Sequence, residues 1–130
     1  MGIAKATFKN AAPYQQDKMS LPVADVDAAI PFYEKFFGFQ VLSRKNEPQK
    51  QVTLGRDGVA FGLAENGGDP TQDGCVFEVD NVELALAEFR SSGLKKEVSD
   101  IKVQMQGQSQ WRVFYVVAPD GLCYCIGERK

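Results

Sequence analysis

LPVADVDAAIPFYEKFFGFQV, residues 21–41, is matched further along the chain by FEVDNVELALAEFRSSGLKKEV, residues 77–98. Apolar, acidic and glycine positions recur in the same order, with a one-residue shift near the end. A second pair of segments repeats in the same way: LGRDGVAFGLAE, residues 54–65, and VAPDGLCYCIGE, residues 117–128. The chain therefore contains two copies of one supersecondary unit of about 55 residues.

Each copy is predicted to begin with a strand and a helix. Apolar strands are expected over Lys18–Val23 and Gly74–Val79, each followed by a residue that favours a helix N-cap, Asp25 in the first copy and Asn81 in the second. Apolar residues then recur every three or four positions, which indicates one buried helix face. Pro31 falls inside the first helix, where we expect a kink or a late start.

Three strands are predicted to follow each helix, and the last two are joined by a tight turn, Arg56-Asp57-Gly58 or Pro119-Asp120-Gly121. The predicted fold is therefore α+β, with two β-α-β-β-β modules forming a curved mixed sheet around a cavity. We expect module one at about 14–65, a linker over 66–72 and module two at about 73–130.

The composition of the chain excludes several classes of function. Its 130 residues fit a single domain over 1–130, and a net charge of −2 disfavours nucleic-acid binding. The absence of histidine excludes Ser-His or Cys-His nucleophile pairs and histidine-based metal sites. Three cysteines without a C-x-x-C motif, no long apolar N-terminal segment and no apolar run of about 18 residues predict a cytoplasmic protein without a membrane partner.

Alternation along the last strand of each module separates bulky from small side chains, because successive residues of a strand point to opposite faces. The bulky rows, Val59/Phe61/Leu63 and Leu122/Tyr124/Ile126, are expected to cover the helices, and the small rows, Ala60/Gly62/Ala64 and Cys123/Cys125/Gly127, to line the opposite face. Small residues there either leave space for a ligand or allow two sheets to pack closely.

Polar and aromatic residues of module two add a second candidate surface. Lys102, Gln104 and Gln106 form an alternating polar row that lines either a cavity or a solvated face, and a longer loop is expected after it. Trp111 and Arg112 follow. A tryptophan is commonly a core residue, but beside an arginine it also suits the stacking of a planar group and the pairing of an anion.

The motif V-A-D-V-D-x-A-I-x-F-Y-E-x-x-F-G-F at residues 23–39, with A-P-D-G at 118–121, resembles the vicinal oxygen chelate superfamily of glyoxalases, bleomycin resistance proteins and extradiol dioxygenases. The resemblance covers residues 15–128 and implies the two-module fold. Metal-dependent members hold a divalent ion with four side chains from the first and last strands of the modules. The matching positions here are Lys18, Gly62, Gly74 and Cys125, a set that implies no metal site.

The resemblance implies a metal-independent small-molecule binding protein of the bleomycin-resistance type, a homodimer without a cofactor, that sequesters a planar or anionic compound. The candidate ligand-binding residues are Lys18, Ser20, Ala60, Gly62, Gly74, Val76, Trp111, Arg112, Cys123 and Cys125. Two alternatives remain open. One is a metal-free lyase or isomerase, with its acid and base among Lys18, Glu65, Tyr115 and Cys125, and the other is a module whose sheet face docks a protein.

Overall fold

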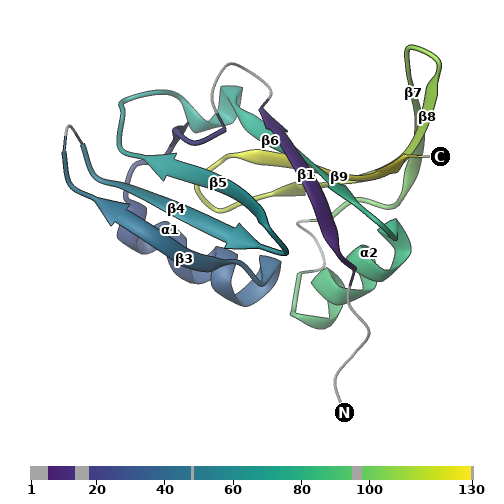
Figure 1. Cartoon of the computed structure of the whole chain (residues 1–130), viewed down its shortest axis with the longest axis horizontal. Helices are drawn as coiled ribbons and strands as arrows, with labels where there is room; N and C mark the ends of the chain where they lie inside the picture. Colours follow the sequence, from purple (N-terminus) through teal and green to yellow (C-terminus); the bar gives the residue numbers. More distant parts are fainter. Residues whose placement is uncertain (1–5, 14–17, 48, 95–97, 130) are drawn as a thin grey trace.

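The computed structural model describes residues 6–13, 18–47, 49–94 and 98–129, and its strands form two sheets with both helices on one side of them (Figure 1). The strands are β1 (Phe8–Pro13), β2 (Leu21–Pro22), β3 (Gln40–Lys45), β4 (Gln51–Arg56), β5 (Val59–Ala64), β6 (Gly74–Val79), β7 (Lys102–Gln106), β8 (Ser109–Val117) and β9 (Cys123–Arg129). The helical segments are α1 (Val26–Phe32), the π-helical turn η1 (Tyr33–Phe37), the 3-10 turn η2 (Pro70–Gln72) and α2 (Val82–Ser91). This arrangement confirms the predicted α+β fold.

The two sheets repeat the same strand order. In the first sheet, β2-β5-β4-β3, the first and last strands of module one pair in parallel. In the second, β1-β6-β9-β8-β7, β6 and β9 of module two pair in parallel in the same way. The first strand of module one is shorter than predicted, although Gly62 N–H still donates to Lys18 O at 2.8 Å and Val23 N–H to Ala64 O at 3.0 Å.

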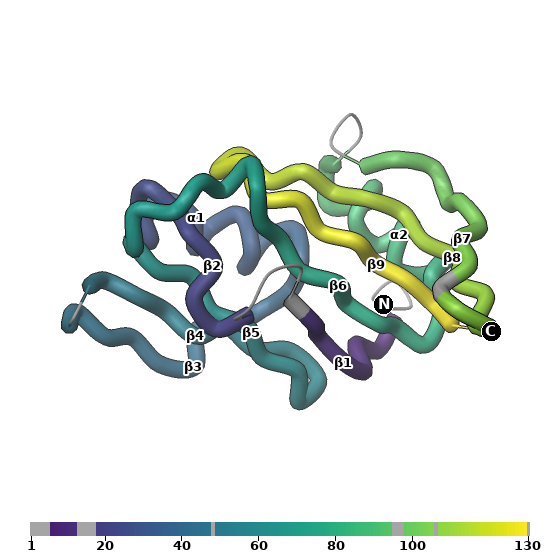
Figure 2. Tube along the Cα trace, turned by 90° about the horizontal axis from the view of Figure 1, so that it is seen from above, coloured from purple at the N-terminus to yellow at the C-terminus, as the bar shows by residue number. Residues whose placement is uncertain are grey.

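Strand β1 has no counterpart in the repeat and was not predicted. It pairs antiparallel with β6, so the N-terminal segment extends the sheet of module two before the chain enters module one. It also lies alongside β5, between the two sheets (Figure 2). Phe8 is buried there and makes edge contacts with Phe39 of module one and Phe77 of module two, so β1 joins the two modules.

The helices begin where the sequence predicts. The side chains of Asp25 and Asn81 accept hydrogen bonds from the N–H groups of Ala28 and Leu84, the third helical residue of α1 and α2. α1 starts at Val26, so the expected late start is wrong. Instead, two residues beyond Pro31, the winding changes to the π-helical turn η1. No helix among the described residues is long and apolar enough to cross a membrane.

The core lies between the sheets and the helices, as the alternation predicts. Phe61 of β5, Phe77 of β6, Tyr124 of β9 and Phe37 of η1 are buried and in mutual ring contact, so one core serves both modules. The faces turned away from the helices form what we call the open face of each sheet. The longer loop expected after the polar row is wrong, because β7 and β8 are joined by a tight turn in which Gly107 has φ +64°.

Candidate functional site

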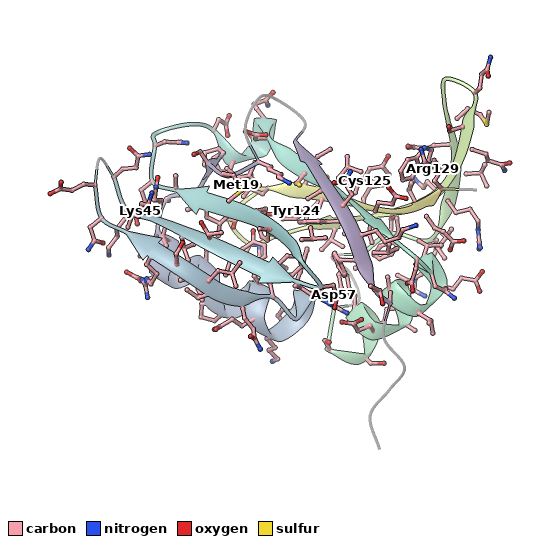
Figure 3. All side chains as sticks on the ribbon, viewed as in Figure 1. Met19, Lys45, Asp57, Tyr124, Cys125 and Arg129 are labelled. Carbon is pink, nitrogen blue, oxygen red and sulfur yellow. The ribbon has the colours of Figure 1, made fainter. Side chains whose placement is uncertain are left out.

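The open face of the second sheet brings together part of the predicted site. Strand register places Val76 beside Cys125, Val117 beside Cys123 and Trp111 beside Arg129, all on the face opposite the buried Phe77 and Tyr124. Figure 3 marks Cys125 and Arg129 along β9. The second-sheet patch, as we name it, consists of Gln104, Trp111, Tyr115, Cys125 and Arg129.

Trp111 owes its position to a glycine on the neighbouring strand. A Cβ atom at Gly127 would come within 3.1 Å of Trp111 Cε3 and 2.9 Å of Val113 Cγ1. The glycine therefore allows the indole to pack closely against β9. The guanidinium of Arg129 stands 5.9 Å from the centre of the indole ring. A half-exposed aromatic ring with a cation beside it suits a planar group that carries negative charge.

Tyr115 supplies the polar centre of the second-sheet patch. Its hydroxyl is hydrogen-bonded to the side-chain amide of Gln104 and is in contact with the Cys125 thiol. Burial raises the pKa of Tyr115, and burial also raises the pKa of Cys125 to about 11. Both groups are therefore neutral at physiological pH and act as hydrogen-bonding groups rather than as a base or nucleophile.

Arg112 does not join Trp111. The two residues are adjacent in β8 and so point to opposite faces, and Arg112 pairs with Glu83 of α2 at 2.7 Å on the helix side. Cys75 also faces the helix side, where burial raises the pKa of its thiol to about 12. The cation that stands beside the tryptophan is Arg129, which sequence reasoning missed although it shares the alternation of Cys125 and Gly127.

The open face of the first sheet is built differently. A Cβ atom at Gly62 would lie 2.2 Å from the carbonyl oxygen of Met19, so the backbone of the segment before β2 covers this glycine and leaves no space for a ligand over it. Two hollows flank the covered centre. One, of about 200 Å³, is lined by Ser20 with Met19, Ser43, Lys45, Gln51 and Thr53. The other, of about 410 Å³, lies beside the β4–β5 turn and includes Ala60.

The four positions that correspond to metal ligands do not fit a metal ion. Gly62 and Gly74 offer no donor atom, and the Lys18 amine donates to Ala11 O at 3.3 Å. Cys125 offers a single sulfur atom. Among the described residues, no three His, Cys, Asp or Glu side chains gather around one point that a metal could occupy. One thiol alone does not make up the set of about four ligands that a divalent ion such as zinc takes.

Glu65 and Glu128, which follow or end the last strands, are engaged at the helix starts. Glu65 accepts a hydrogen bond from Val26 N–H and Glu128 from Val82 N–H, each at 2.9 Å. The two modules therefore also share a glutamate at the same position, whose carboxylate accepts a hydrogen bond from the first N–H group of a helix. Their role in the structure is therefore to cap the two helices.

Solved structures of the same fold include several small-molecule binding proteins. A bleomycin-binding protein complexed with bleomycin superimposes with a TM-score of 0.71 at 21% identity, over 89% of this chain and 99% of that one. An antibiotic binding protein from Streptomyces sp. CB03234 gives 0.63 at 17% identity, over 89% and 97%. A virulence protein from Salmonella typhimurium gives 0.67 at 18% identity, over 88% and 95%.

At these identities the structural likeness establishes the fold. No curated protein sequence matches the chain significantly. A family model does match: residues 15–100 fit the model described as Glyoxalase/Bleomycin resistance protein/Dioxygenase superfamily. The helix cap, the hairpin turn and the parallel strand pair each occur in both modules of the structure. Together with the match to the family model, this shows that the chain belongs to the glyoxalase/bleomycin resistance protein/dioxygenase superfamily.

Proposed function

We propose that the protein binds a planar or amphipathic small molecule with an anionic group on the second-sheet patch. The observation that carries the proposal is the packing of Trp111 against Gly127, with the Arg129 guanidinium over the ring at 5.9 Å from its centre. The indole offers a stacking surface, Arg129 offers the charge, and the Gln104–Tyr115 pair offers hydrogen bonds beside the indole. The similarity to bleomycin-binding and antibiotic-binding proteins supports this class of ligand.

The chemistry of the candidate groups favours binding over turnover. A lyase or isomerase of this fold without a metal would need a base, and the raised pKa values of Tyr115 and Cys125 keep both groups protonated at neutral pH. The other two candidates are already engaged, Lys18 with Ala11 O and Glu65 with Val26 N–H. We therefore propose sequestration of a ligand without a metal or other cofactor.

We further propose that a second copy of the chain covers the open face, so that the working form is a homodimer. Val117 of the second sheet is 50% exposed and Met19 beside the first sheet is 37% exposed, and both are apolar. The polar hollow that contains Ser20 and Lys45 is also lined by Met19 and would receive the polar part of a ligand held against Trp111 of the partner.

Calorimetric titration with two compounds tests the proposed ligand class. Naphthalene-2-sulfonate is planar and anionic, and naphthalene-2-sulfonamide has the same rings without the charge. We expect the sulfonate to bind the wild type more tightly, Trp111→Leu to weaken both compounds about tenfold or more, and Arg129→Gln to weaken only the sulfonate, about two- to fivefold.

Arg112→Gln is the matched control, because it removes the same charge from the opposite face of the neighbouring strand β8. It should leave both affinities unchanged. Equal losses from Arg112→Gln and Arg129→Gln, binding unaffected by Trp111→Leu, or no binding of the sulfonate to the wild type would each contradict the proposal.

Sedimentation of the wild type over a range of concentrations tests the homodimer. Val117→Lys puts a charge on the open face, and Val103→Lys puts the same charge on an exposed valine of the other face. We expect Val117→Lys to shift the protein to the monomer and to weaken ligand binding, and Val103→Lys to do neither. A monomeric wild type, or a dimer indifferent to Val117→Lys, would refute this part of the proposal.

A further inference from the structure

A hollow on the helix side of the molecule, away from the open face, has no place in the proposed function. It lies between α1 and the turn that joins β8 to β9, segments that adjoin in both views (Figures 1 and 2), and has a volume of about 220 Å³. Its walls are mostly apolar, with one carboxylate from each side. The residues that line it are Ala24, Asp25, Ala28, Ala29, Phe32, Pro119 and Asp120.

The corresponding place beside α2 is filled, which shows what this hollow lacks. There the β4–β5 turn carries Arg56, whose guanidinium pairs with Glu88 of α2 at 2.7 Å, donates to Ala6 O at 2.9 Å and lies over the Phe8 ring. The N–H of Phe8 donates to Asp57 of the same turn at 3.0 Å. An ion pair and the N-terminal segment thus occupy the crevice between helix and turn.

The repeat explains why the hollow beside α1 stays open. Pro119 stands where module one has Arg56, and Phe32 stands where module two has Glu88, so the ion pair is replaced by two apolar side chains that line the hollow. Ala28 stands where α2 has Leu84, a partly buried residue packed against the core. A shorter side chain on the helix and the missing N-terminal segment leave the space.

The two carboxylates at this hollow have only neutral hydrogen-bond donors as partners. Asp25 accepts from Ala28 N–H, and Asp120 accepts from Leu122 N–H at 2.9 Å and from the Tyr33 hydroxyl at 2.9 Å, all of which are neutral donors. Across the parts of the chain that the structure describes, neither forms an ion pair with a lysine or arginine. Burial raises the pKa of Asp120, so a cation nearby would offset the cost of its charge.

We propose that this hollow is a second ligand site, for a small compound with one apolar ring and an ammonium group. An apolar cavity of about 150 Å³ is large enough to bind benzene, so the volume here accommodates one ring. Phe32, Ala29 and Pro119 contact the ring, and Asp25 and Asp120 attract the ammonium group from opposite walls. The site is separate from the second-sheet patch and selects the opposite charge.

Titration by two-dimensional NMR with benzylammonium and benzyl alcohol tests the site, because the two probes share a ring and differ in charge. We expect benzylammonium to bind with a millimolar dissociation constant, to shift the amide signals of Ala28, Ala29 and Asp120, and to leave the indole signal of Trp111 in place. Benzyl alcohol should bind the same hollow about two- to fivefold more weakly.

Two variants take their new residue from the equivalent position of the other module, so each is known to suit the fold. Asp25→Asn introduces the residue that caps α2, which keeps the cap and removes a charge, and should weaken benzylammonium about two- to fivefold without affecting benzyl alcohol. Ala28→Leu introduces the counterpart of Leu84 at an exposed helix position and should abolish binding of both probes.

Binding of benzylammonium that survives Ala28→Leu would overturn the site, and so would shifts confined to other parts of the molecule. Equal affinity for the two probes, or an Asp25→Asn variant that binds benzylammonium as the wild type does, would overturn the preference for a cation. Naphthalene-2-sulfonate binding at the second-sheet patch should be the same in Asp25→Asn, Ala28→Leu and the wild type, which separates this inference from the proposed function.

Discussion

The two modules share a backbone plan and differ in what they place on its open face. In module one the small row contains Gly62, over which the Met19 backbone lies, so the centre of that face is closed by the chain itself. In module two the equivalent position is Cys125, and Trp111 and Tyr115 flank it instead. The repeated sequence determines the arrangement of the strands in both modules. Single residues on the open face determine whether backbone or side chains cover each sheet.

The same contrast holds on the helix side. One crevice between a helix and a turn is closed by the Arg56–Glu88 pair and the N-terminal segment, and its counterpart beside α1 is open and apolar. A duplicated unit therefore has one closed and one open copy of each surface. Substitutions confined to one module, compared with a corresponding or related residue elsewhere, therefore test this contrast.

Arg56→Ala is expected to have the largest effect on stability. Both members of the Arg56–Glu88 pair have side chains only 8% exposed, and the variant leaves the Glu88 carboxylate buried without its partner. We expect the free energy of unfolding, measured with urea, to fall by about 3–5 kcal/mol. Arg112→Ala breaks the more exposed pair with Glu83 and should cost less than about 1 kcal/mol. Similar losses in the two variants would contradict the contrast.

The thiol of Cys125 is expected to react slowly with iodoacetamide. The reactive form is the thiolate, and a pKa of about 11 in place of the ordinary 9.0 lowers its population and the rate at pH 8 by about 100-fold. In a Cys123→Ser background, mass spectrometry should show the Cys125 rate rising about tenfold per pH unit until pH nears 11, and Cys75 should react even more slowly. Rapid labelling of Cys125 at neutral pH would show that its site is open and polar.

Gly62→Ala tests whether the backbone closes the face of module one. The new methyl group would lie 2.2 Å from Met19 O, so the segment before β2 must move. We expect the free energy of unfolding, measured by thermal or urea unfolding, to fall by about 1–3 kcal/mol. At the equivalent position of module two, Cys125→Ala shortens a buried side chain without introducing a clash and should cost about 1 kcal/mol. A neutral Gly62→Ala would mean that the open face of module one has space at its centre.

Glu65→Ala and Glu128→Ala are expected to have the smallest and most similar effects. Each removes a 2.9 Å hydrogen bond to the first amide of a helix, α1 in one case and α2 in the other. The loss should be about 1 kcal/mol in each variant, measured by urea unfolding. A clear difference between them would show that the pseudo-symmetry of the modules does not extend to this contact.

Much of the fold could be predicted from the sequence because its signals are local. Asp25 and Asn81 mark the helix starts, and Asp57-Gly58 marks a turn in which both residues have positive φ, +57° and +81°. The strand β1 could not be predicted in this way, because its only strong apolar residue is Phe8 and its place beside β6 depends on contacts distant in sequence.

The placement of the candidate site residues on the sheet could be predicted in part for the same reason. Alternation correctly placed Cys125 on the face opposite the buried Tyr124, and applied to β8 it also separates Trp111 from Arg112, which sequence proximity had grouped together. Arg129 was missed because it ends the chain's last strand, where no motif marks it. That Met19 covers Gly62 depends on the path of the backbone, which residue types alone do not reveal.

Fluorine NMR of the chain's one tryptophan, labelled as 5-fluorotryptophan, tests the central claim most directly. Titration with naphthalene-2-sulfonate should shift the single Trp111 resonance saturably, with the dissociation constant found by calorimetry and with a weaker response in Arg129→Gln. A resonance that stays in place while calorimetry reports binding would show that the ligand site lies elsewhere and would contradict the account.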